Sequence, residues 1–252
     1  MKTDFCLTGV TTEMFADWVV GDKPLVVLLP IGSVEPHGPH LGLLTDTIIS
    51  QASAERAAAR LNAQDIVAVI APGIPYGVTD CAAGFAGAVS IPKSALVAYI
   101  EAVINGFLAN GTDHVCVINN HLEPDQYAAA TEAMTSFGQR ASVACPLQRR
   151  WARTLSDEFK KGECHAGRYE TAIVLAADSR GVKPGVMAEL PEVPVSLSDQ
   201  LRAGVNTFKE MGMAQAYAGA PALASVEEGE ALLDKLAEMI VTEVREGLSL
   251  QP

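Results

Sequence analysis

Apolar positions along the chain fall into two kinds of segment. Short runs of consecutive apolar residues, many of them β-branched, predict strands buried on both faces, at 25–31, 66–71, 114–118 and 141–146. Longer alanine-rich or amphipathic segments predict helices at 45–61, 92–110, 124–137, 149–159, 169–177 and 226–248. Residues 181–224 show no clear periodicity. Since strands alternate with helices, the pattern predicts an α/β fold with helices on both faces of a mostly parallel central sheet.

Size and composition are those of one globular domain. The chain has 252 residues, of which 49% are hydrophobic and 19% charged, so we expect a single domain over residues 1–252. A formal net charge of -12 argues against nucleic acid as a partner, because binding to a phosphate backbone needs clustered Lys and Arg. There is no apolar stretch of membrane-spanning length and no signal-peptide pattern, so we expect no membrane partner and a cytoplasmic location.

Two mirror-image triplets carry the candidate chemistry. Residues 35–37 read Glu-Pro-His, and residues 121–123 read His-Leu-Glu. In an extended segment, residues i and i+2 point to the same side, so each triplet aims a carboxylate and an imidazole at a common point. Each triplet follows a predicted strand, and ligand sites of parallel sheets lie beyond the carboxyl ends of the strands. Together with Asp46, the triplets offer side chains for two divalent cations.

The ligand types indicate the metals and the reaction. Carboxylate oxygen and imidazole nitrogen without thiolate suit zinc, manganese or ferrous iron. Three carboxylates leave part of the charge of two divalent ions uncompensated, which favours hydroxide, the nucleophile of a metal-assisted hydrolase. We therefore expect two divalent metal ions (Zn, Mn or Fe) as cofactors, bound by Glu35, His37, Asp46, His121 and Glu123.

The sequence around the first triplet resembles a family signature. Residues 30–41 (PIGSVEPHGPHL), followed by Thr45 and Asp46, closely resemble the signature of the creatininase (creatinine amidohydrolase) family. Three further segments, 85–90, 119–123 and 165–171, are similar to family segments in the same order. The resemblance spans residues 25 to 175.

This resemblance implies a single-domain three-layer α/β/α sandwich with a dinuclear metal site. It implies that Glu35 and His121 hold one metal, that His37 and Glu123 hold the other, and that Asp46 bridges them. The implied reaction is hydrolysis of a C–N bond in a small cyclic amide or formamide, commonly in a homo-hexamer. We therefore expect a small-molecule substrate and a homo-oligomer.

Other residues in these segments have implied or supporting roles. The family uses a histidine of its last segment as a proton shuttle, which corresponds to His165 here, and Glu123 is assigned to catalysis as well. A shuttle is needed because an amide nitrogen is a poor leaving group until it receives a proton. We expect His40 and Glu170 to support a ligand or the shuttle through hydrogen bonds.

Three departures from family patterns are assigned to substrate contacts. Leu122 stands where creatininase proper has an aromatic residue, and Cys164 where it has an acidic one, which indicates a substrate other than creatinine. Arg168 stands where many members carry glutamate. Its forked donors suit a carboxylate on the substrate.

Two functional classes follow. The leading hypothesis is a metal-dependent amidohydrolase acting on a small cyclic amide or related compound, with a lactonase or deformylase as the close variant because the same nucleophile attacks any comparable carbonyl. The alternative from another class is a noncatalytic, metal-stabilised oligomeric binding protein.

Overall fold

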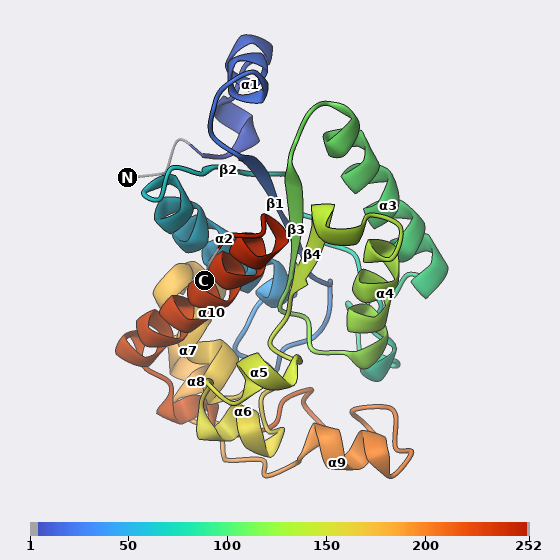
Figure 1. Ribbon diagram of the computed structural model, residues 1–252. Helices are drawn as coiled ribbons and strands as arrows, with labels where there is room; N and C mark the ends of the chain where they lie inside the picture. Colours follow the sequence, from blue (N-terminus) through green and yellow to red (C-terminus); the bar gives the residue numbers. More distant parts are fainter. Residues whose placement is uncertain (1–4, 251–252) are drawn as a thin grey trace.

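The central element is a four-stranded sheet in which every neighbouring pair of strands is parallel. A computed structural model describes residues 5–250 (Figure 1); the first four and last two residues of the expected domain lie outside them. The strands are β1 (Leu25–Ile31), β2 (Val67–Ile70), β3 (His114–Asn119) and β4 (Ala141–Ala144), in the order β2-β1-β3-β4. The predicted α/β fold with a parallel central sheet is confirmed.

Helices cover both faces of this sheet. One layer consists of α2 (Thr45–Asn62), α7 (Arg168–Ala177) and α10 (Val226–Gly247), and the other contains α3 (Lys93–Ala109) and α4 (Pro124–Met134), as Figure 1 shows. All seven residues of β1 are buried, because alternate side chains enter opposite cores. Val26 and Leu28 pack in the core beneath α2, α7 and α10, whereas Val27 and Leu29 pack beneath α3 and α4. The continuous apolar run in the sequence reflects this two-sided burial.

The predicted helix over 149–159 is wrong in its extent. The structure has two short helices there, α5 (Arg149–Ala152) and α6 (Asp157–Lys161). Ser156 caps the second one, since its hydroxyl accepts a hydrogen bond from the Phe159 amide at 3.2 Å. A short helix α1 (Thr12–Val19), capped by Thr11, was not predicted.

Residues 181–224 form a cover at one end of the molecule. They contain α8 (Pro184–Met187), α9 (Leu197–Arg202) and turns. Phe208, Met211 and Met213 pack there against Cys81 and Ala82, forming a third, smaller apolar cluster. Single-turn 3₁₀ helices lie at Leu7–Gly9, Asp80–Ala82, Gly138–Arg140, Ser179–Gly181 and Pro221–Leu223. None of the helices within residues 5–250 combines the length and apolar character needed to cross a bilayer.

Candidate active site

The two triplets meet at the carboxyl edge of the sheet. β1 and β3 are adjacent, and their register pairs Ile31 with Asn119, so the chain leaves both strands at the same level. Each triplet begins a few residues later. Their ionisable side chains are buried together with that of Asp46, which lies in the first turn of α2. The predicted convergence of these residues is therefore present.

Glu35, Asp46 and His121 form one compact group. His121 Nδ1 lies 3.1 Å from Glu35 Oε1 and 3.1 Å from Asp46 Oδ2. His121 Nε2 is 2.7 Å from the carbonyl oxygen of Val78, which only accepts, so Nε2 carries the proton of the neutral ring and Nδ1 presents a lone pair. A backbone carbonyl thus sets the tautomer that a metal ligand requires.

A second group contains His37, Asp46 and Glu170. His37 Nε2 lies 3.3 Å from Asp46 Oδ1 and 3.5 Å from Glu170 Oε2. His37 Nδ1 is 3.1 Å from the carbonyl oxygen of Glu35, so it donates and leaves the Nε2 lone pair aimed at the carboxylates. The two oxygens of Asp46 therefore face different imidazoles, one in each group.

Neighbouring polar groups hold the carboxylates in place. Ser33 Oγ donates to Asp46 Oδ2 at 3.0 Å, and the Thr79 hydroxyl donates to Glu35. The amide of Ala166 donates to Glu170 Oε2 at 2.7 Å. Ala166 has a left-handed backbone (φ 50°), a conformation that is uncommon for a residue with a side chain and is concentrated at functional sites.

The two groups suit cations. His37 Nε2 and Asp46 Oδ1 are buried and have no hydrogen-bond partner among residues 5–250, although they face each other. Two lone pairs at this distance are stable only with a positive charge between them, either a proton or a metal ion. Burial lowers the pKa of His37, but the nearby carboxylates, first Asp46, outweigh it and raise this pKa to about 10. Burial also opposes ionisation of Asp46, yet His37 and His121 hold its pKa well below the usual range.

Glu123 lies beside these groups and belongs to neither of them. Its oxygens accept hydrogen bonds from the backbone amides of Asp80 (2.9 Å) and Cys81 (3.2 Å), and Oε2 is 3.9 Å from His121 Nε2. Burial raises the pKa of Glu123 to about 7. The resemblance implied that His37 and Glu123 hold the same metal. In the structure Glu170 lies beside His37, and Glu123 lines the adjoining cavity.

His165 is buried between two rings at the edge of the site. Its ring lies 4.5 Å from that of His37 and 4.2 Å from that of Phe208, with which it stacks at 30°. Its Nε2 donates to the carbonyl oxygen of Pro36 at 3.0 Å, and its Nδ1 is 3.7 Å from Glu35 Oε1. Burial, followed by repulsion from His37, lowers the pKa of His165 to about 4. His165 is therefore neutral near pH 7 and has one free lone pair.

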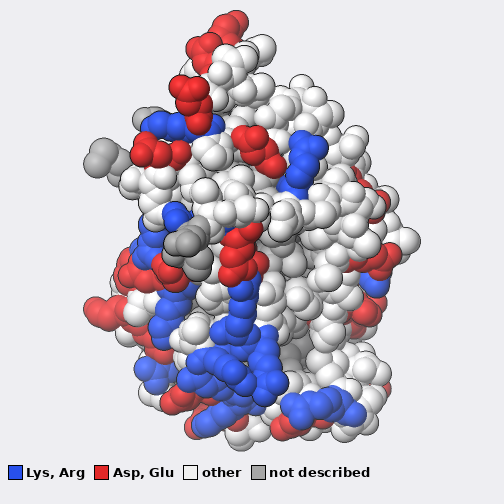
Figure 2. Space-filling model, in the orientation of Figure 1, with Lys and Arg blue, Asp and Glu red and all other residues white. Residues whose placement is uncertain are grey.

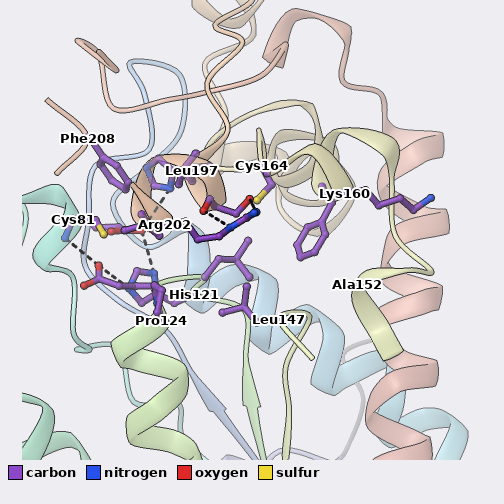
Figure 3. Close-up of a pocket in the computed structure, with 18 residues that line it drawn as sticks. Cys81, His121, Pro124, Leu147, Ala152, Lys160, Cys164, Leu197, Arg202 and Phe208 are labelled. Atoms are coloured by element: carbon purple, nitrogen blue, oxygen red, sulfur yellow. Dashed lines mark hydrogen bonds and ion pairs between the residues drawn. The ribbon is translucent and has the colours of Figure 1, made fainter. Parts of the chain in front are cut away.

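A cavity of about 400 Å³ opens directly onto these groups (Figure 3). Leu122 and Cys164, both assigned to substrate contacts, line it together with Glu35, His121, Glu123 and His165. Arg168 does not line it. Its Nε donates to Glu228 at 2.5 Å, outside the cavity. His40 is buried behind the second group, where its Nε2 is 2.9 Å from Thr171 Oγ1.

Comparison with known proteins decides the family. The family described as Creatininase: Creatinine amidohydrolase matches residues 10–244. This chain belongs to the creatininase family. The resemblance stated from the sequence is thus confirmed, as is the predicted enzyme class, the metal-dependent amidohydrolases.

The similarity to individual relatives covers most of the chain. A mycofactocin precursor peptide peptidase of Mycobacterium tuberculosis is 30% identical over 226 residues, covering 86% of this chain and 84% of its own. The solved structure "Creatininase Mn" superposes with a TM-score of 0.76 at 20% identity, over 99% of this chain and 100% of its own. A mutant creatininase of Zn-Zn type superposes with a TM-score of 0.72 at 20% identity and the same coverage. This chain therefore shares the fold of these creatininases over nearly its whole length.

Some features of the site were predicted only in part, and others were not predicted. Glu170 was expected to support a ligand or the shuttle, and it lies beside His37, but nothing local in the sequence shows that it joins the group of His37 and Asp46. Phe208 lies in the aperiodic segment 181–224 and carries no sequence signal for its stacking on His165. The amides of Asp80 and Cys81, which donate to Glu123, are backbone groups. Whether they reach Glu123 depends on the conformation of the loop, and residue type does not predict it.

Proposed function

We propose that this chain is a dinuclear metal-dependent hydrolase that cleaves a C–N amide bond in a small compound. The supporting observation is the buried carboxylate of Asp46, whose two oxygens face His121 and His37 at 3.1 and 3.3 Å. A carboxylate shared between two imidazole-containing groups suits a bridging ligand of two cations.

The residues fit two divalent cations. Glu35, Asp46 and His121 would hold one, and His37, Asp46 and Glu170 the other. When bound, such ions polarise a carbonyl oxygen and lower the pKa of water, so that hydroxide becomes available near neutral pH. The solved relatives described as Mn and Zn-Zn forms favour manganese or zinc among the metals considered.

Glu123 and His165 would move the protons of the reaction. Glu123 lines the cavity, and a carboxyl with a pKa of about 7 accepts and returns a proton with little cost at neutral pH. Its two backbone donors fix the carboxylate without neutralising it. His165 also lines the cavity, and a proton taken up by its Nδ1 would be passed on readily, because burial and His37 lower the pKa of this ring to about 4. Either residue supplies what the amide nitrogen needs to leave.

The test is a hydrolysis screen with protein loaded with Zn²⁺ or Mn²⁺. The compounds are cyclic amides, dipeptides, formamides and lactones, so that the lactonase and deformylase variants are outcomes of the same screen. We expect turnover of an amide, its loss on chelation and its recovery when metal is added back.

Asp46→Ala should abolish both turnover and metal retention. Asp157→Ala is the matched control, because this acid is exposed on α6 and pairs with Lys160 at the surface. Full metal loading without turnover of any compound would contradict the proposal and favour the noncatalytic binding protein.

A further inference from the structure

The cavity that adjoins the candidate metal ligands is walled mostly by apolar side chains. Apart from the catalytic groups, its lining includes Leu122, Leu147, Phe159, Leu197, Leu201 and Phe208. These come from the loop after β3, the loop after β4, helices α6 and α9, and the segment after α9. A volume of about 400 Å³ lies within the range of pockets that enclose drug-sized ligands. The space therefore suits a substrate with a sizeable apolar body.

One guanidinium stands among these apolar residues. Arg202, on α9, lines the cavity (Figure 3). Its ion pair is with Asp199 on the same helix, at 3.0 Å, and both side chains are mostly exposed (74% and 67%). Pairs of this kind contribute little to stability, since water competes for both partners. Arg202 also donates from Nε to the carbonyl oxygen of Ser198 at 3.0 Å and from Nη2 to Ser198 Oγ at 3.2 Å, and these contacts too are exposed. Arg202 can therefore exchange such partners for a carboxylate on a ligand at low cost, with two parallel hydrogen bonds.

Other cations near this cavity also favour an anionic ligand. Five of the 18 Lys and Arg residues of the chain lie within residues 149–161, on and beside α5 and α6, which contribute Ala152, Phe159 and Lys160 to the lining. Arg149, Arg153 and Lys161 have no ion pair within residues 5–250, unlike Arg150 and Lys160. Figure 2 shows Lys and Arg side chains gathered, with some acidic ones among them, at the end of the molecule where α5, α6 and α9 lie. In a protein of net charge -12, these cations favour the approach of an anion to this side of the cavity.

From these observations we propose that the substrate is an anionic amphiphile, an amide with an apolar body and a carboxylate, and that Arg202 binds this carboxylate at the mouth of the cavity. The inference rests on the proposed function for the reacting amide, but the recognition of the anion stands on the cavity and Arg202. The carboxylate role first assigned to Arg168 thereby passes to Arg202, because Arg168 lies outside the cavity and is paired with Glu228.

Binding of nonreacting probes tests the inference separately from turnover. The probes are 4-phenylbutanoate, the neutral alcohol 4-phenylbutan-1-ol, and acetate, titrated by calorimetry into metal-loaded protein. We expect the aromatic carboxylate to bind at least tenfold more tightly than the alcohol and than acetate. Affinity for acetate equal to that for 4-phenylbutanoate would contradict the apolar part of the proposal, and equal affinity for the alcohol would contradict the anionic part.

Variants separate Arg202 from the metals, which also attract carboxylates. Arg202→Gln should weaken 4-phenylbutanoate binding about tenfold and leave binding of 4-phenylbutan-1-ol unchanged. Arg180→Gln is the matched control, because Arg180 forms a similar exposed pair with Asp178 and does not line the cavity. If Arg202→Gln keeps the full preference for the carboxylate, the anion binds elsewhere and the inference is wrong. If that preference depends on Arg202 but no amide is hydrolysed, the inference holds and the proposed function fails.

Discussion

Glu170 Oε2 lies 3.5 Å from His37 Nε2, inside the buried group that also contains Asp46. The two residues are far apart in the sequence, and α7 brings them together by packing against α2, whose first turn carries Asp46. The positions of two glutamates therefore differ: Glu170 lies within a group of candidate metal ligands, and Glu123 lines the adjoining cavity.

Replacement of Glu170 should reduce metal content. In Glu170→Gln we expect the loss of about one of two equivalents, because His37 and Asp46 alone would hold the second ion, and an amide is a weaker ligand than a carboxylate. Metal analysis after gel filtration, at a fixed low concentration of Zn²⁺ or Mn²⁺, measures this. Retention of two equivalents by Glu170→Gln, with loss by Glu123→Gln, would restore the pairing of Glu123 with His37.

Replacement of Glu123 should reduce turnover without loss of metal. Glu123→Gln keeps the shape of the side chain but removes its proton transfer, which is worth roughly 10²- to 10⁴-fold in rate. Turnover number, Michaelis constant and metal content of the same preparation are the measurements. We expect the turnover number to fall while the metal content stays at that of the unmodified protein. A fall in metal content parallel to the fall in rate would make Glu123 a ligand.

The sequence was most informative where local pattern and chemistry coincide. The run 25–31 is apolar at every position because both faces of β1 are covered, and the two triplets follow from their position after β1 and β3. The sequence placed Glu170 near the site only through the resemblance, and the packing of α7 that brings it to 3.5 Å from His37 leaves no local pattern. The same holds for Arg168 and Arg202: only the folded chain shows which arginine lines the cavity.

Because α10 packs closely on α7, we expect a methyl group added at Gly229 to destabilise the fold strongly. A Cβ on Gly229 would lie 1.9 Å from the carbonyl oxygen of Ala172, so the two helices would have to separate. We expect Gly229→Ala to lower the free energy of unfolding by about 1–3 kcal/mol or more. Gly106→Ala, in α3, is the control: a Cβ there meets nothing within 4 Å, and the change should raise stability by roughly 0.5–1 kcal/mol. Urea denaturation measures both, and equal effects would show that α7 and α10 are not this close.

His114 predicts a pH dependence of stability that does not involve the candidate active site. It lies at the start of β3, at the opposite end of the strand, where its Nδ1 is 2.9 Å from the carbonyl oxygen of Gln139 and its Nε2 is 2.8 Å from Ser142 Oγ. The carbonyl accepts from Nδ1, and in the neutral ring Nε2 accepts from the serine hydroxyl. Burial lowers the pKa of His114 to about 4.

The sign of the effect follows from the order of the two pKa values. In the unfolded chain His114 titrates near its ordinary value of about 6.5, so between pH 6.5 and 4 the unfolded state binds a proton that the folded state does not. Titration of His114 therefore leaves the free energy of unfolding unchanged above pH 6.5 and lowers it as the pH drops from 6.5 towards 4. Below pH 4 the contribution of this residue is constant. At about 1.4 kcal/mol per pH unit, the loss across the window approaches roughly 3 kcal/mol.

Comparison with His114→Gln isolates this contribution from those of the other histidines. Glutamine can donate to the Gln139 carbonyl but does not titrate, so we expect this variant to be less stable at pH 7 and to lose less stability on acidification. The measurement is the free energy of unfolding in urea at half-unit steps from pH 7.5 to 4, for both proteins in the presence of a chelator, so that metal release does not contribute. Parallel curves over the whole range would mean that His114 does not titrate differently in the folded and unfolded states, and the buried neutral ring would be refuted.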